Sequence, residues 1–332
     1  MLKSWLWRSV GVVALAYVLG VLVLMWWWDY EPAHFDVAAN GREVTAQVAG
    51  SARTVTGSVT TAALITSAQT LLDKRGGYLS NDRLPPGVLM DNVPNWEFGV
   101  LTATRDLARA LRNDFSRSQT QSVEDPDLRE ADPLFSSPND RWLLPSSESQ
   151  YRKAITHMRA YLARLVGGGE ASAQFYARAD NLADYLQVVS TRLGSLSQRL
   201  SAAAGQVRLD TTLAGDPHAQ QASATPSEQL VRTPWTRIDD NFYEARGYSW
   251  ALREQLEAIR IDFAPILGSK NAAVSLEQII RELEEAQRAL GSPVVLNGRP
   301  FGFFANHSLV MANYISRANA AIIDLRELLK RG

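Results

Sequence analysis

The chain has 332 residues and a nearly balanced charge, with 34 Lys and Arg against 35 Asp and Glu. This balance argues against nucleic acid as a partner, because nucleic-acid-binding domains usually carry a strongly basic patch. The chain contains no cysteine, which excludes disulfide bonds, thiolate zinc sites, iron–sulfur clusters and cysteine nucleophiles. The lack of thiols also suits a bacterial envelope, where the periplasm oxidises them.

The first predicted element is an uncharged, proline-free run from Ser9 to Trp28. About twenty helical residues at about 1.5 Å each span the roughly 30 Å hydrocarbon core of a bilayer. Tryptophans are typical of the two headgroup layers, and here they stand at both ends of the run: Trp5, Trp7, Trp26, Trp27 and Trp28. Residues 9–28 are therefore predicted to cross a membrane.

The flanking charges predict the orientation of this helix. Lys3 and Arg8 precede it without an acidic residue among them, whereas Asp29, Glu31 and Asp36 follow it. Because Lys and Arg collect on the cytoplasmic side, we expect a cytoplasmic N-terminus. Without those two basic residues, 32 basic residues face 35 acidic ones, a net charge of −3 for the exported part.

A cleavable signal peptide is the alternative interpretation of this end of the chain. Its apolar core would be about 7–15 residues long and would precede a small-residue cleavage site. The run here is longer and ends in three tryptophans, so an uncleaved anchor is favoured. The expected organisation is a cytoplasmic segment 1–8, a transmembrane anchor 9–28, and a domain 29–332 outside the cytoplasm.

Beyond the anchor, apolar residues repeat at helical spacing almost throughout. The clearest stripes lie in segments 171–203 and 236–263, and we expect these two helices to pack on each other. Their stripe residues are Leu182, Leu186, Val189, Leu193, Leu196 and Leu200 in the first, and Ile238, Phe242, Ala245, Ser249, Leu252, Leu256, Ile259 and Phe263 in the second.

Five further helices are expected at 43–72, 96–115, 147–166, 275–290 and 308–329. Six or seven helices without a recurring strand period predict an all-α fold, an elongated antiparallel helical bundle. Linkers are expected near 116–149, 205–235 and 291–306. In the last of these, Asn297-Gly298 favours a small hairpin.

The sequence contains no recognisable catalytic constellation. Its four histidines form no HExxH or similar pair, and no GxSxG elbow, Walker loop or GxGxxG motif is present. Neighbouring carboxylates such as Glu284 and Glu285, on a helix rich in arginine, usually form solvated ion pairs with those arginines. We therefore expect no catalytic residue, no metal site and no cofactor, and hence no enzyme.

An apolar loop, Leu84 to Leu101, is one candidate interaction surface. It combines three prolines with apolar residues that include Met90, Trp96 and Phe98, and exposed apolar loops on rigid scaffolds commonly bind partners. The alternative is that these side chains close one end of the bundle.

Three arginines that follow this loop form the second candidate. Arg105, Arg109 and Arg112 stand at i, i+4 and i+7, so their guanidinium groups share one helical face. Planar guanidinium groups suit phosphate or carboxylate. The alternative is a solvated face whose charges pair with nearby acids.

Several strings resemble a known family. They are LPPGVLMDNVPNWEFGVLTATRDLARALR, DPLFSSPNDRWLLPSSESQY, FYARADNLADYLQVVSTRLGSLSQRL and TPWTRIDDNFYEARGYSWAL. They are similar to uncharacterised inner-membrane proteins of Pseudomonas and related proteobacteria, classified as a domain of unknown function. The resemblance covers most of the chain and implies a bacterial inner-membrane location, with the anchor 9–28 in that membrane and the domain 29–332 in the periplasm. It implies no activity, cofactor or site residue.

These observations favour a protein that acts by binding a protein partner, as an envelope scaffold, adaptor or assembly factor. A sensory or small-ligand-binding bundle is the first alternative. Its weakness is that only about eight residues precede the membrane run, so a partner would have to relay the signal. An envelope hydrolase is the second alternative.

Overall fold

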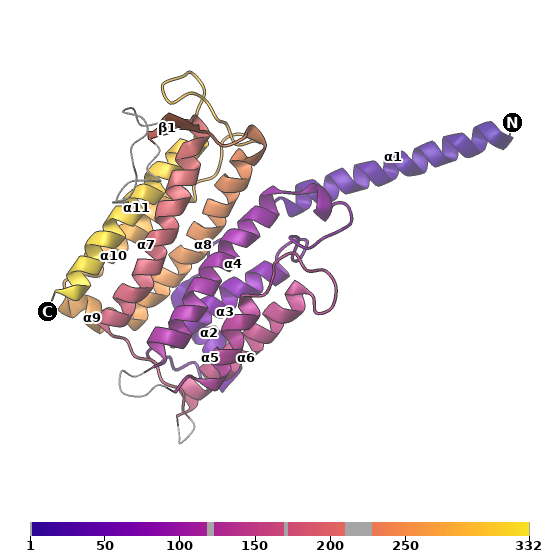
Figure 1. Ribbon diagram of the computed structural model, residues 1–332. Coiled ribbons are helices and arrows are strands. Elements are labelled where there is room, and N and C mark those ends of the chain that lie inside the picture. The colour runs from indigo at the N-terminus through magenta and orange to yellow at the C-terminus, as the bar shows by residue number, and fades with distance from the viewer. Residues whose placement is uncertain (1, 118–122, 169–171, 210–227, 332) are drawn as a thin grey trace, which may run out of the picture.

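The computed structural model describes residues 2–117, 123–168, 172–209 and 228–331. Its first helix, α1 (Leu2–Trp28), projects alone from a helical domain (Figure 1). The part of α1 from Trp7 to Trp28 is long and apolar enough to cross a membrane, and none of it is buried. The expectation of an all-α fold with a single N-terminal apolar helix is confirmed.

The described part of the chain beyond α1 contains ten α-helices and one strand pair. The helices are α2 (Val37–Ala49), α3 (Ser58–Asp73), α4 (Asn92–Ala110), α5 (Pro126–Phe135), α6 (Ser147–Gly167), α7 (Ala179–Ser201), α8 (Ile238–Asp262), α9 (Ala264–Ser269), α10 (Ala273–Ala286) and α11 (His307–Lys330). Strands β1 (Gln206–Leu209) and β2 (Glu228–Val231) pair antiparallel.

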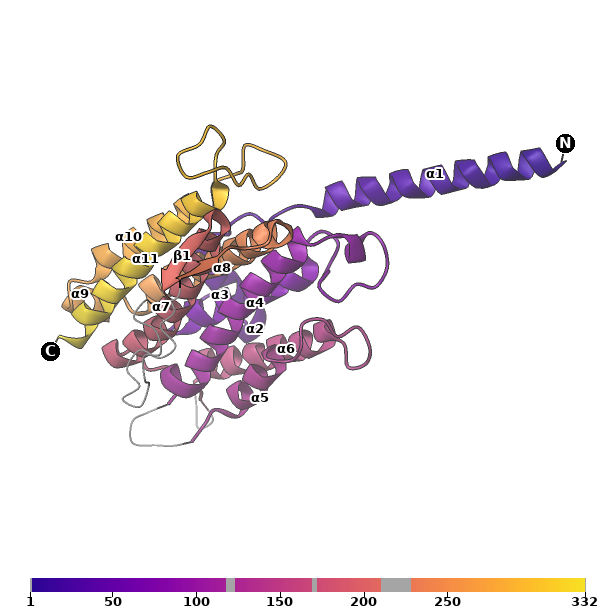
Figure 2. The same cartoon turned by 45° about the horizontal axis from the view of Figure 1, so that its top comes forward.

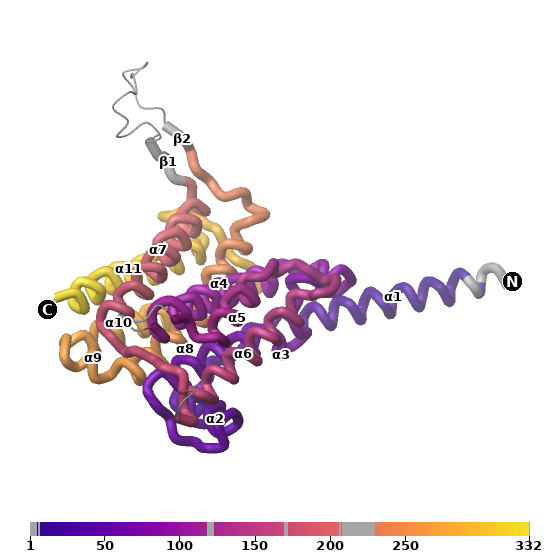
Figure 3. The backbone as a smooth tube through the Cα atoms, turned by 60° about the horizontal axis from the view of Figure 1, so that its bottom comes forward, coloured from indigo at the N-terminus to yellow at the C-terminus, as the bar shows by residue number. Residues whose placement is uncertain are grey.

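The helices form two groups that meet at α4 and α8. Helices α7, α8, α10 and α11 make one group, and α2 to α6 make the other (Figure 1). The end of the domain that carries α9 and the C-terminus lies far from α1 (Figure 3). The end beside α1 holds the loops before α4 and α6 (Figures 1 and 2).

Two glycines allow α4 and α8 to approach closely. A Cβ atom on Gly99 would lie 2.1 Å from the carbonyl oxygen of Glu244, and one on Gly247 would lie 1.9 Å from that of Trp96. Larger residues at these two positions would force the helices apart, because the obstructing atoms belong to the backbone. The contact between the two helix groups therefore depends on glycine at both sites.

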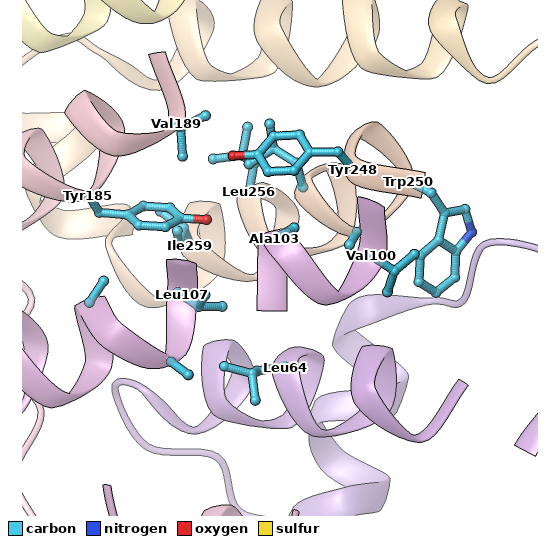
Figure 4. Packing of buried hydrophobic residues seen from close by; sticks show 14 of the residues in the cluster. Leu64, Val100, Ala103, Leu107, Tyr185, Val189, Tyr248, Trp250, Leu256 and Ile259 are labelled. Atoms are coloured by element: carbon cyan, nitrogen blue, oxygen red, sulfur yellow. The ribbon is translucent and has the colours of Figure 1, made fainter. Parts of the chain in front are cut away.

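Apolar side chains from four helices fill the space around this contact (Figure 4). Leu64 of α3, Leu107 of α4, Val189 of α7 and Leu256 of α8 are all fully buried there. The predicted stripes of segments 171–203 and 236–263 are buried throughout, which confirms which faces of α7 and α8 are apolar.

The predicted partnership of those two helices is wrong in its main contact. Helix α7 lies chiefly against α11, and α8 lies chiefly against α4, although α7 and α8 also touch. One shared contact joins Tyr185 and Gln255 through a hydrogen bond of 2.8 Å. A stripe identifies the apolar face of a helix but not the helix that covers it.

Segment 43–72 is two helices and not one. Gly50 and Gly57 adopt φ values of 70° and 89°, in the left-handed region that ends a right-handed helix. Helix α2 accordingly ends at Ala49 and α3 begins at Ser58. This division, with the short helices α5 and α9, explains why the bundle has more helices than the six or seven expected.

Segment 116–149 is not an extended linker throughout. It contains α5, which begins at Pro126. The preceding residue, Asp125, caps the helix, because its carboxylate accepts hydrogen bonds from the N–H groups of Asp127 and Leu128. Pro126 follows in the first turn, where proline is well tolerated. Here an Asp-Pro pair starts a helix within a segment that was predicted to be a linker.

The other two linkers contain local pairing. Segment 205–235 includes β1 and β2, and its residues 210–227 lie outside the described residues. In segment 291–306, an isolated antiparallel bridge joins Asn297 and Asn306. The chain therefore reverses direction between these two residues and not at the predicted Asn297-Gly298 turn. This loop between α10 and α11 projects from the domain (Figure 2).

Candidate functional site

The predicted apolar loop, Leu84 to Leu101, divides into an exposed part and a buried part. Leu84, Val88 and Leu89 are exposed, and Met90 is half-buried. Trp96 lies within α4 and is 1% exposed, with its ring 5.3 Å from that of Trp250. Phe98 is half-buried.

The predicted arginines meet the α5 segment, two of them from α4 and Arg112 from the short π-helical turn that follows α4. Arg105 donates two hydrogen bonds of 2.7 Å to backbone carbonyls at the C-terminal end of α5 and just beyond it. Arg112 pairs with Glu124 and Asp132, each at 3.0 Å, and Arg109 Nε lies 3.8 Å from Asp132. These guanidinium groups hold α5 against α4, and they do not join the apolar loop in one surface.

A further cluster of polar contacts lies where the segment after α1 crosses the domain. Arg246 of α8 is 5% exposed, and its Nε donates to Glu31 Oε1 at 2.6 Å while Nη2 donates to Oε2. The same guanidinium donates to the carbonyl of Arg288 at 2.9 Å, just past the end of α10. A buried arginine is tolerated only when it is paired and hydrogen-bonded, and here both conditions are met.

A second contact of this segment lies one helical turn beyond Trp250. His34 Nδ1 is 2.5 Å from Oε1 of Glu254, a fully buried carboxylate that also accepts a 3.1 Å hydrogen bond from Arg253. The His34 ring stacks on Trp250, with ring centroids 6.0 Å apart. Phe35 meets the same indole edge-on at 6.1 Å.

The last turn of α1 is itself in contact with the domain. The guanidinium carbon of Arg75 lies 4.4 Å from the Trp27 ring centroid and 4.0 Å from that of Tyr30, which are cation–π distances. Gly76, with φ of 81°, leaves the space in which Trp28 lies, because a Cβ atom there would be 2.7 Å from the indole. We call the contacts of residues 27–36 with the domain the junction.

A buried ion pair supports the domain side of the junction. Lys74, which follows α3, pairs with Glu97 of α4, and both side chains are buried. Glu97 also accepts hydrogen bonds of 2.8 Å from the backbone N–H groups of Leu79 and Ser80. Burial raises the pKa of Glu97, and the Lys74 ammonium opposes this effect. The pair fixes the turn that carries Arg75 and Gly76.

A cavity of about 350 Å³ adjoins the junction. Its lining includes Asp29, Glu31, Tyr243 and Arg246. Burial raises the pKa of Asp29. Since Arg246 and Glu31 are paired with each other, the Asp29 carboxylate and the Tyr243 hydroxyl are the lining oxygens that we consider for a ligand. Among the described residues, no group of three or more His, Asp or Glu side chains is placed to hold a metal ion.

The comparisons with known proteins assign a family. A family model described as an uncharacterised protein conserved in bacteria (DUF2333) matches residues 1–332. The chain belongs to this family. The resemblance to a bacterial domain of unknown function is thus confirmed over the whole chain. No curated protein and no solved structure matches it.

The junction was not among the features predicted from the sequence. Glu31 and Arg246 are 215 positions apart, and neither stands in a motif. The available signal was the cluster of charged and aromatic residues immediately after the apolar run, which was interpreted only as a marker of orientation. An anchor followed by a flexible tether would show no preference for such residues.

Proposed function

We propose that the chain is a single-pass protein of the bacterial inner membrane, with a cytoplasmic N-terminus and a periplasmic helical domain. In this proposal α1 is the anchor, and the domain acts by binding a protein partner as an envelope scaffold, adaptor or assembly factor. The charge bias around α1 and the tryptophans at both of its ends support the location and the orientation.

The junction is the observation that carries this proposal. A helix that served only to retain the domain at a membrane would need no more than a flexible tether. Here the residues after α1 use a buried arginine, a buried carboxylate and two aromatic contacts to bind the domain. Such an arrangement supports a domain held at a fixed orientation to the membrane, which is what a scaffold needs in order to present one face.

The loop between α10 and α11 is the face that we assign to a protein partner. Phe301, Phe303 and Phe304 are exposed there, with Phe303 97% exposed. Asn306 closes the base of the loop by donating to Asn297 Oδ1 at 2.9 Å and to the Gly298 carbonyl at 2.7 Å. Exposed aromatic side chains on a closed loop are typical of the anchor residues of protein interfaces.

Two experiments on the full chain test the proposal. A phosphatase fused after Gly332 should be active, and a fluorophore that matures only in the cytoplasm should stay dark at the same site. A photo-crosslinking residue at Phe303 should capture a discrete protein in cells, whereas the same residue at Val274, an isolated exposed site on α10, should not. The reverse fusion pattern would refute the orientation, and equal behaviour at the two crosslinking sites would refute the binding face.

A sensory function is the second candidate, and the cavity beside the junction favours it. A small amine would match the carboxylate and phenol oxygens of the lining. Its binding beside Glu31 would alter the contacts that hold α1. Small amines should then raise the unfolding temperature of the full chain, and Tyr243→Ala should abolish the rise. No stabilisation by any amine would remove this candidate.

A further inference from the structure

Two loops beside the end of α1 expose apolar side chains that the junction does not use. The loop before α4 exposes Leu84, Val88 and Leu89, and the loop before α6 exposes Trp142, Leu143 and Leu144. Leu84 is 77% exposed and Leu144 is 94% exposed. We call these six residues the apolar rim.

The apolar rim lies beside the last turn of α1. A hollow of about 370 Å³ is lined jointly by Trp28, Leu84 and Trp142. A second hollow is lined by Met25 and Trp26 on one side and by Leu89 and Met90 on the other. Both loops lie at the end of the domain from which α1 leaves (Figures 1 and 2).

The two loops are tied to each other and hold their positions. Asn81 Nδ2 donates to the Arg141 carbonyl at 3.0 Å and to Glu148 at 2.7 Å. Arg83 donates to the Asp140 carbonyl at 3.1 Å. The rim is therefore a surface with a defined shape, and its apolar side chains do not fold back onto the domain.

We propose that the apolar rim inserts into the headgroup region of the lipid leaflet from which α1 emerges. The inference rests on the proposed function, because it requires α1 to span the membrane. The tryptophans at the end of α1 mark the level of the headgroups, and the rim flanks two of them, Trp26 and Trp28. Residues at the level of the headgroups contact lipid wherever the domain does not cover α1.

The chemistry of the rim fits an interfacial position. Trp142 combines an apolar ring with an N–H donor, which is the side chain that membrane interfaces favour. Arg83 and Arg141 flank the apolar residues and are exposed, so their guanidinium groups can reach lipid phosphates while their stems stay with the apolar layer. A protein partner or a second copy of the chain are the occupants that the experiment must distinguish from lipid.

The absence of cysteine allows a direct test. A nitroxide label is attached to Leu143→Cys in the full chain, which is placed in nanodiscs of phosphatidylethanolamine and phosphatidylglycerol. Collision rates with oxygen and with a water-soluble nickel chelate are then measured. Val274→Cys on α10, also exposed, is the aqueous control, and Val18→Cys in the middle of α1 is the lipid control.

The oxygen-to-nickel ratio at Leu143→Cys should be several-fold higher than at Val274→Cys and lower than at Val18→Cys. A ratio equal to that at Val274→Cys, with Val18→Cys in lipid, would overturn the inference while leaving the anchor intact. Low collision rates with both reagents would overturn it in favour of a protein occupant. An aqueous ratio at Val18→Cys would overturn the anchor itself and the inference with it.

Discussion

The approach of α4 to α8 predicts that Gly247→Ala destabilises the fold. The new Cβ atom would lie 1.9 Å from the Trp96 carbonyl oxygen and 2.7 Å from its carbonyl carbon. Since unstrained contacts lie near about 3.5 Å, the helices would have to separate by roughly 1 Å or more. Overpacking lowers the free energy of unfolding by up to about 3 kcal/mol. The better helix propensity of alanine offsets about 1 kcal/mol of this loss. The expected net loss is about 2 kcal/mol, or roughly 4 °C in the unfolding temperature.

Thermal unfolding of the full chain in detergent, followed by circular dichroism, measures this loss. Gly194→Ala on α7 is the matched control, because the nearest atom to its added Cβ is Asn319 Nδ2 at 3.6 Å, an ordinary contact. That variant should be as stable as the parent or more stable, by up to about 1 kcal/mol. If Gly247→Ala unfolds at the same temperature as Gly194→Ala, the close approach of the two helices is not what the glycine permits.

Three further changes test the core and the buried charges. Leu256→Ala should lower the free energy of unfolding by about 2–5 kcal/mol, whereas Glu284→Ala, at an exposed ion pair, should change it by less than about 0.5 kcal/mol; equal effects in denaturant titrations would refute the assignment of the core. Lys74→Met should cost about 3 kcal/mol at neutral pH by leaving Glu97 unpaired, and the loss should shrink on acidification as that carboxylate takes up a proton; a loss that is constant with pH would contradict this. Burial and a facing carboxylate raise the pKa of Asp114 to about 6. Its ionisation therefore disfavours the folded state above that pH, and Asp114→Asn should stabilise the protein at pH 8 and not at pH 4, as unfolding midpoints at the two values would show.

Residue spacing predicted the helices and their apolar faces well. The stripes of α7 and α8 were readable because a buried helix repeats its apolar residues every three or four positions. Residue spacing could not predict which helices pack together, because that depends on where two helix backbones can approach each other. Gly99 and Gly247 direct α8 to α4, and glycines at helix positions give no direct signal of their partner.

The candidate site was predicted only in part. The loop from Leu84 was recognised as unusual, but the pattern could not separate Leu84, which is exposed, from Trp96, which is buried. The arginines do share one face, yet their partners Glu124 and Asp132 come from a segment interpreted as a linker. Pairs of this kind join residues distant in sequence, so their identity emerges only from the tertiary fold.

The fixed orientation of the domain relative to α1 is the central claim, and one distance measurement tests it most directly. Spin labels at Val18→Cys in α1 and Val188→Cys on α7, both exposed, report the distance between anchor and domain by pulsed electron resonance in nanodiscs. We expect a narrow distribution that broadens when Glu31 and Arg75 are both replaced by alanine. Glu277→Ala, at an exposed pair far from the junction, should leave it narrow. A broad distribution in the parent chain, or one that the double replacement leaves unchanged, would contradict the account.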